Sequence, residues 1–179
     1  MSRFGYVMTT YVVVLAIGVL SFVHVAPKLI WNASASAPLG LYRIESARNA
    51  PLGALVAVAP PERLARWMAE RRYLGLDAPL LKHVTARAGQ RICRIGAVVS
   101  VDDRPVAVAR ERDRLGRPLP VWRGCRTLAA GELLLINPAV PDSLDGRYFG
   151  PLPASALIGR AIPILTRDAP GSPLVWRGL

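Results

Sequence analysis

Two short stretches of this sequence carry side chains that could cooperate in hydrolysis. Ser36 lies in the small-residue segment 32–42, and Lys82 lies in the mainly apolar segment 79–85. A serine hydroxyl is a poor nucleophile unless a base within about 3 Å takes its proton. An apolar environment lowers the pKa of a lysine amine and so makes it available as that base. The pattern predicts nucleophilic catalysis by a serine–lysine pair.

Lysine is rare in this chain, which strengthens the assignment of Lys82. Of the 23 lysines and arginines, only Lys28 and Lys82 are lysine. Arginine cannot lose its proton in a protein, so a position that needs a neutral amine accepts only lysine. Chance retention is the alternative. The histidines are poorer bases, because His24 ends an apolar run and His83 should point to the opposite face of a strand from its neighbour Lys82.

Three motifs in the same order resemble bacterial type I signal peptidases. They are the serine segment 32–42, the lysine segment 81–84, and Ser143-x-Asp-x-Arg-Tyr-Phe-Gly150 followed by residues 157–161. Proline stands second after Ser36, which is closer to the conjugative-transfer branch, the TraF-type peptidases, than to the housekeeping leader peptidases. The resemblance covers nearly the whole chain. It implies a mostly β, signal-peptidase-like catalytic domain that needs no cofactor.

The resemblance also implies supporting roles for other side chains. Ser143 would hold the lysine amine toward the nucleophile. Asp145 and Arg147 would form an ion pair that supports the site, with Asp145 not acting as the base. A carboxylate directly beside the Lys82 amine would favour the charged amine and oppose catalysis, so a supporting role suits Asp145 better. The hydroxyl of Ser34 and the backbone N–H of Ser36 would donate hydrogen bonds to the oxyanion. These roles stay expectations at this stage.

Residues 1–28 are predicted to form a membrane anchor. The apolar run from Phe4 to Val25 would reach roughly 33 Å as a helix, which is enough to cross a hydrocarbon core of about 30 Å. The competing interpretation is a cleaved signal peptide, because Arg3 precedes the run and small residues follow it at positions 33–37. The apolar run is longer than the usual apolar region of a signal peptide, which has about 7–15 residues, and cleavage at positions 33–37 would sever the serine segment.

The orientation of this anchor depends on conflicting signals. Arg3 is the only charge before the run, whereas Lys28 and many arginines follow it. The positive-inside rule alone therefore favours a cytoplasmic location for the domain after the run. The family resemblance favours an inner-membrane protein with a cytoplasmic N-terminus and a periplasmic catalytic domain. Cys93 and Cys125 would form a disulfide in an exported domain, worth roughly 3–4 kcal/mol, but would be two unrelated thiols in cytosol.

Residues 29–179 are predicted to form one domain of short strands with a single amphipathic helix. The helix is expected after Pro60, ending before Gly75, with its apolar side packed on the sheet. Residues 102–105 predict a turn, and residues 110–120 a solvated loop. The strands are expected at Gly40–Ile44, Ala54–Ala59, Leu80–Ala86, Ala97–Val101, Val106–Ala109, Leu133–Asn137 and Leu157–Ile164.

The net charge of +11 is compatible with several partners. The arginines are dispersed among acidic residues and no nucleic-acid motif is present, so contact with anionic lipid explains the charge better than nucleic acid does. Two cysteines and two histidines stand at no metal-ligand spacing, so no metal is expected. The expected partners are membrane lipid, an exported precursor cut after small residues and, through the resemblance, a conjugative secretion machinery with a pilin substrate. A general signal peptidase and an inactive membrane-anchored assembly factor are the alternatives.

Overall fold

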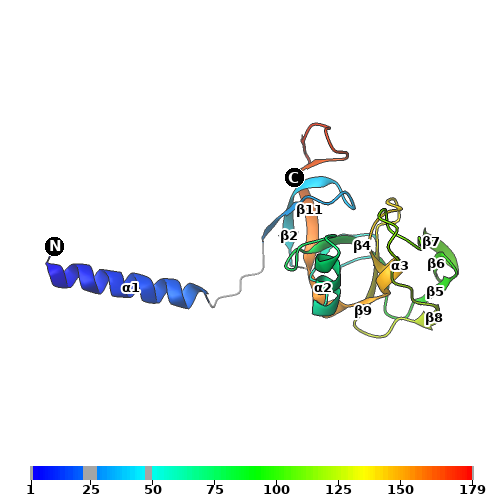
Figure 1. Cartoon of the computed structure of the whole chain (residues 1–179), viewed down its shortest axis with the longest axis horizontal. Helices are drawn as coiled ribbons and strands as arrows, with labels where there is room; N and C mark the ends of the chain where they lie inside the picture. Colours follow the sequence, from blue (N-terminus) through cyan, green and yellow to red (C-terminus); the bar gives the residue numbers. More distant parts are fainter. Residues whose placement is uncertain (1, 22–27, 47–49, 179) are drawn as a thin grey trace.

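The computed structural model describes residues 2–21, 28–46 and 50–178 of the chain. It is mostly β, with two antiparallel sheets and few helices (Figure 1). The larger sheet has the strand order β1-β2-β11-β3-β4-β9-β10, with β12 paired to β11, and the smaller has the order β7-β6-β5-β8. The strands of the larger sheet are β1 (Leu29–Asn32), β2 (Leu39–Glu45), β3 (Leu55–Val58), β4 (Leu80–Arg87), β9 (Glu132–Ile136), β10 (Leu152–Pro153), β11 (Leu157–Arg167) and β12 (Val175–Trp176).

The smaller sheet and the helices complete the domain. The strands of this sheet are β5 (Arg91–Ile95), β6 (Val98–Val101), β7 (Arg104–Val108) and β8 (Gly124–Thr127). The helices are α1 (Arg3–Ser21), α2 (Glu62–Glu70), α3 (Gly146–Phe149) and the 3₁₀ helix η1 (Ala154–Ala156).

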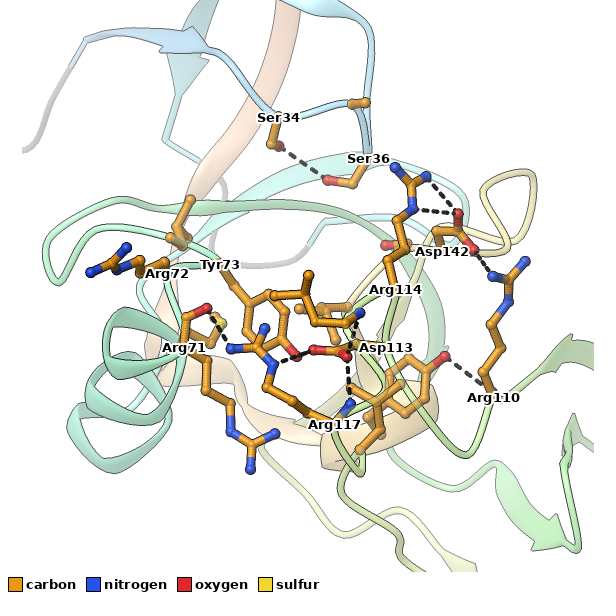
Figure 2. Close-up of a pocket in the computed structure, with 18 of the residues that line it drawn as sticks. Ser34, Ser36, Arg71, Arg72, Tyr73, Arg110, Asp113, Arg114, Arg117 and Asp142 are labelled. Carbon is orange, nitrogen blue, oxygen red and sulfur yellow. Dashed lines mark hydrogen bonds and ion pairs between the residues drawn. The ribbon is translucent and has the colours of Figure 1, made fainter.

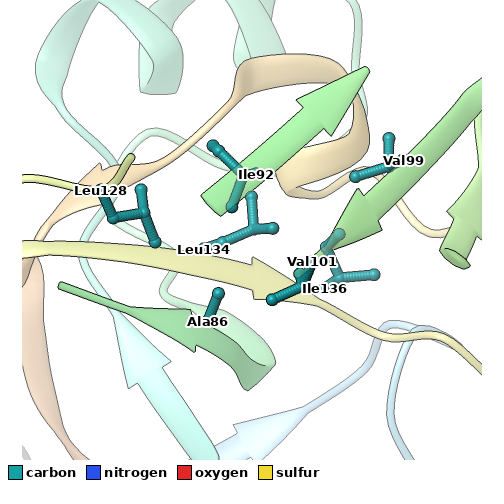
Figure 3. Close-up of a cluster of buried hydrophobic side chains, with 7 residues drawn as sticks. All are labelled: Ala86, Ile92, Val99, Val101, Leu128, Leu134 and Ile136. Carbon is teal, nitrogen blue, oxygen red and sulfur yellow. The ribbon is translucent and has the colours of Figure 1, made fainter. Parts of the chain in front are cut away.

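A buried apolar cluster joins the two sheets. Figure 3 shows these side chains converging from β4, β5, β6, β9 and the segment after β8. Val99, Ile92, Leu134 and Ile136 are fully buried. Because this cluster fixes the smaller sheet against β4 and β9, it also fixes the strand that carries Lys82. The members are Ala86, Ile92, Val99, Val101, Leu128, Leu134 and Ile136.

Each predicted strand is present, but five of the described strands were not predicted. β1, β10 and β12 belong to the larger sheet, and β5 and β8 make up half of the smaller one. The predicted turn is right at Asp102 and Asp103, which have φ values of 47° and 62° between β6 and β7. Arg104 and Pro105 already belong to β7, where a proline is tolerated because β7 is an edge strand.

Helix α2 ends earlier than the sequence predicts. It stops at Glu70, and Arg72 then adopts a left-handed conformation with φ 58°. Trp67 packs edge-on against Phe149 of α3, with ring centroids 5.6 Å apart. The apolar side of α2 thus contacts α3, next to the site described below.

The predicted membrane span is not confirmed. Within the described part of the chain, no helix, α1 included, combines the length and the apolar character that a membrane crossing requires. Residues 22–25 of the predicted run, with His24 among them, lie outside the described residues.

Candidate active site

Asn32 organises the loop that carries Ser36 between β1 and β2. Its side-chain amide donates to the carbonyl oxygens of Ser34 (2.9 Å), Ala37 (3.1 Å) and Pro38 (3.0 Å). Its Oδ1 accepts from the backbone N–H of Ser34 at 3.0 Å and from its hydroxyl at 2.9 Å. The buried side chain of Asn32 therefore bonds three other residues of the loop, Ser34, Ala37 and Pro38, and so restricts its conformation.

The two serines of this loop lie next to each other. Ser34 Oγ is 3.2 Å from Ser36 Oγ (Figure 2). After the loop, β2 pairs closely with β11: a Cβ on Gly40, whose φ is 139°, would lie 2.1 Å from the carbonyl oxygen of Leu165. Gly40 is thus required by contact between two strands of this protein.

Lys82 is a buried cation on β4. Its side chain is only 3% exposed, and its Nζ donates a hydrogen bond to Ser143 Oγ at 2.9 Å. Desolvation lowers the pKa of Lys82 to about 8, while the charge of Asp145 raises it and the charge of Arg147 lowers it. A substantial fraction of this amine is therefore neutral in mildly alkaline solution.

Asp145 and Arg147 form the expected ion pair, and both side chains are fully buried. Arg147 Nε lies 2.8 Å from Asp145 Oδ1 and Nη2 lies 3.1 Å from Oδ2. Arg147 also donates to the carbonyl oxygens of Pro141 at 3.0 Å and Asn137 at 2.8 Å. The pair thereby fixes both ends of the segment that delivers Ser143 to Lys82. Its contacts support a positioning role.

Asn137 is a central residue of the site that the sequence analysis missed. Its Nδ2 donates to the carbonyl oxygens of Ser36 and, at 3.0 Å, Leu81. Its Oδ1 accepts from the backbone N–H of His83 at 3.1 Å and lies 2.9 Å from His83 Nδ1. Asn137 thus connects the serine loop to both neighbours of Lys82. A polar residue directly after the apolar strand β9 was the available signal.

One cavity of about 660 Å³ contains the predicted catalytic side chains. Ser34, Ser36, Lys82 and Ser143 line it together. The segment 110–120 is a largely exposed loop, as predicted, and it also forms part of the cavity wall (Figure 2). Asp113 holds this segment in place, because its carboxylate accepts from the hydroxyl of Tyr73 and from Arg117 Nε at 2.6 Å.

Cys93 and Cys125 form the predicted disulfide. They face each other on the neighbouring strands β5 and β8, and their sulfurs are 2.04 Å apart. The next residue on β5, Arg94, donates to the carbonyl oxygen of Arg147 at 2.6 Å. Through this bond, the smaller sheet contacts the segment that carries the Asp145–Arg147 ion pair. Among the described residues, no group of three His, Cys, Asp or Glu side chains could hold a metal ion.

Comparisons with known proteins agree with these features. Residues 2–166 match the family described as signal peptidase, peptidase S26. Similar proteins include a probable conjugal transfer protein TraF of Sinorhizobium fredii, which is 38% identical over 145 residues, covering 75% of this chain and 76% of the relative. The conjugal transfer protein TraF of Agrobacterium fabrum is 36% identical over 149 residues, covering 76% and 82%.

A plasmid transfer protein TraF of Escherichia coli is 34% identical over 147 residues, covering 75% of this chain and 81% of the relative. Among solved structures, a signal peptidase I of Enterococcus faecalis V583 aligns with 64% of this chain and 98% of its own, at 12% identity and a TM-score of 0.39.

Proposed function

Because the chain belongs to the signal peptidase family, peptidase S26, we propose that it is a serine endopeptidase in which Ser36 is the nucleophile and Lys82 the general base. One observation carries this proposal. Lys82 is buried, its pKa is lowered to about 8, and it shares one cavity with Ser36. Among the residues that the structure describes, no carboxylate lies within ion-pair distance of the Lys82 amine. A buried lysine of this kind suits proton transfer better than structural support.

The proposed reaction starts with the neutral amine of Lys82. This amine takes the proton of Ser36 Oγ as the oxygen attacks the substrate carbonyl carbon. The backbone N–H of Ser36 and the hydroxyl of Ser34 donate to the resulting oxyanion. The protonated Lys82 then gives its proton to the leaving amine, which leaves an acyl group on Ser36. A water molecule deprotonated by Lys82 hydrolyses this ester and restores the free hydroxyl.

Ser143 and the Asp145–Arg147 pair act on this reaction through Lys82. The hydroxyl of Ser143 accepts the 2.9 Å hydrogen bond from Nζ and so restricts the rotamers of a flexible side chain. The ion pair holds the segment on which Ser143 lies. We therefore assign these three residues positioning roles.

For the biological setting, we propose maturation of an exported precursor, most specifically a pilin subunit, during conjugative transfer. The names of the relatives support this setting. The proposal includes an inner-membrane location, with the apolar N-terminal segment as anchor and residues 29–179 on the periplasmic side. The Cys93–Cys125 disulfide supports that placement, because disulfides persist in oxidising compartments.

The proposed chemistry is tested by two substitutions, with cleavage of the co-expressed precursor in membranes as the measurement. Ser36→Ala removes one oxygen and should abolish cleavage. Lys82→Arg keeps a cation of similar length but cannot accept a proton, so its activity should fall by about 10²–10⁴. Lys28→Arg is the matched control, because Lys28 is exposed, and it should cleave normally.

Two results would contradict the proposal. Cleavage by Lys82→Arg above about a tenth of the normal rate would exclude a general base at this position. Normal DNA transfer and pilus assembly in a strain carrying Ser36→Ala would instead favour an assembly factor without catalytic activity.

A further inference from the structure

The cavity that contains Ser36 has a surplus of positive charge. It is lined by three carboxylates, Glu70, Asp113 and Asp142, and by twice as many arginines. Figure 2 shows Arg110 and Arg114 next to Asp142, and Arg117 next to Asp113. The arginines are Arg71, Arg72, Arg110, Arg112, Arg114 and Arg117.

The two aspartates are already used by some of these arginines. Asp142 pairs with Arg110 and Arg114, each at 2.6 Å, and Asp113 pairs with Arg117 at 2.6 Å. Neither carboxylate is therefore free to neutralise the rest of the wall.

Arg71, Arg72 and Arg112 carry the remaining positive charge. Throughout the described ranges, no carboxylate lies within ion-pair distance of these three guanidinium groups. Arg71 is partly used, since it lies over the Trp67 ring at 4.7 Å and donates to the Pro118 carbonyl at 2.9 Å. Arg112 donates to the Gly116 carbonyl at 2.7 Å.

Arg72 occupies a backbone position that favours glycine. Its N–H bonds the Ala69 carbonyl at 2.9 Å, and the N–H of Tyr73 bonds the Met68 carbonyl at 2.9 Å, which together end α2. The residue between these bonds has φ 58°, a conformation that glycine adopts without steric penalty and arginine does not. In the part of the chain that the structure describes, the exposed side chain of Arg72 makes no hydrogen bond or ion pair. A strained backbone at a residue with such a side chain suggests a functional reason for that side chain.

The location of Arg72 indicates what this reason is. Arg72 lines the catalytic cavity and also a neighbouring cavity of about 600 Å³. Ser34 lines both cavities as well, so the two meet beside the proposed oxyanion donor. A peptide chain passing Ser36 from one cavity to the other would pass Arg72, whose long, exposed side chain can reach it.

We propose that Arg72, supported by Arg112, binds carboxylate side chains that flank the scissile bond of the precursor. A planar guanidinium group recognises a carboxylate by paired, charge-assisted hydrogen bonds, and the surplus charge of the wall attracts an acidic segment in addition. This inference rests on the proposed function and adds the substrate class: a precursor with Asp or Glu within a few residues of its cleavage site.

The test measures peptide binding separately from cleavage. The full-length Ser36→Ala protein, in neutral detergent, is titrated against three fluorescent peptides that share one small-residue cleavage site. Two carry a pair of aspartates, before or after that site, and the third carries asparagines instead. We expect one aspartate peptide to bind about 3- to 10-fold more tightly than the asparagine peptide, the range for one or two exposed ion pairs. This preference should fall at 0.5 M salt.

Substitutions at Arg72 separate charge from structure. Arg72→Gly should bring the preference close to one without lowering the melting temperature, because glycine relieves the left-handed strain. Arg72→Lys keeps the charge and should retain a measurable preference. Arg104→Gln is the matched control, since Arg104 is exposed on β7 and lies outside both cavity linings. It should leave the preference unchanged.

Three binding results would overturn the inference, and so would one cleavage result. The first is equal affinity for all three peptides, or no binding of either aspartate peptide up to millimolar concentration. The second is a preference that Arg72→Gly leaves intact. The third is loss of binding to phosphatidylglycerol vesicles in Arg72→Gly without loss of peptide preference, which would assign the arginines to the membrane surface. Precursor cleavage that requires Ser36 and Lys82 but is indifferent to acidic residues would leave the proposed function standing and refute this inference alone.

Discussion

Lys82 is the residue at which folding and the proposed catalysis make opposite demands. Burial of the amine makes its neutral form accessible, and the charges of Asp145 and Arg147 act on it in opposite directions. In the folded state, a charged ammonium group must remain in a site with one hydroxyl partner, Ser143. The protein is therefore less stable when Lys82 is protonated than when it is neutral.

We predict a specific dependence of stability on pH. The pKa of Lys82 is about 8 in the folded state and 10.5 in the unfolded chain. Between these values the unfolded chain binds a proton that the folded protein lacks, so the free energy of unfolding rises with pH, by about 3 kcal/mol over this window. Urea titrations from pH 8 to 10.5 should show this rise relative to Lys82→Met. The difference in unfolding free energy between the wild type and Lys28→Met should not change with pH. If the difference between the wild type and Lys82→Met is also independent of pH, the pKa of Lys82 is not lowered.

At the scale of elements, the site depends on how the serine loop, β4 and β9 are held together. Asn137, at the end of β9, connects the Ser36 carbonyl to the backbone on both sides of Lys82. Such a connection restricts the position of the proposed nucleophile, Ser36, relative to the proposed base, Lys82. Effective catalysis needs this geometry within a fraction of an ångström.

Asn137→Ala should lower kcat more than it raises KM, because it loosens the serine loop without removing a group that contacts substrate. Loss of the buried amide should also destabilise the protein by about 1–3 kcal/mol. Steady-state kinetics and urea unfolding on the purified protein measure both effects. Thr85→Ala is the matched control, since Thr85 bonds the Ile136 carbonyl between the same strands but does not contact the loop. Equal losses of kcat in Asn137→Ala and Thr85→Ala would mean that Asn137 only stabilises the fold and does not position the serine loop.

The predicted strands include runs of apolar residues, such as β3 and β9, and a strand with alternating burial, β2, whereas β8 and β5 carry neither signal clearly. β2 buries Gly40, Tyr42 and Ile44 on one face, and this period is visible in its residues. β8 is exposed at all four positions, so no alternation marks it as a strand. β5 contains Arg94, which is buried although it is charged, because its guanidinium group bonds the Arg147 carbonyl.

The candidate site shows the same division. Ser36, Lys82 and Ser143 were predicted from motifs, and the structure brings them into one cavity. The roles of Asn137 and Arg72 were missed because they depend on geometry that no local pattern records. One is a contact across 101 residues, and the other is a backbone conformation at a helix end.

At the scale of the whole molecule, the Cys93–Cys125 disulfide crosslinks two neighbouring strands of the smaller sheet. The two cysteines are 32 residues apart in sequence. Replacing both cysteines with serine should lower the free energy of unfolding by roughly 3–4 kcal/mol, because the unfolded chain regains the freedom of that loop. Lys82 and Ser36 belong to the larger sheet and its loops, so kcat below the melting temperature should change little. Thermal unfolding and kinetics of the double variant test this, with the reduced wild-type protein as control. A large loss of kcat at unchanged stability would contradict this prediction.

The long separations within the site also bear on when the protein could become active during its synthesis. Lys82 meets Ser143 61 residues later in the chain, and the Ser36 carbonyl meets Asn137 101 residues later. Contacts of this range form only after the intervening chain has been made and its loop entropy overcome. A nascent chain that has passed Lys82 but not Ser143 therefore carries the proposed nucleophile and base without the groups that position them. Under the proposed mechanism, the small-residue segment around Ser36, itself similar to the expected cleavage site, would not be cut by its own chain until almost the entire polypeptide has left the ribosome.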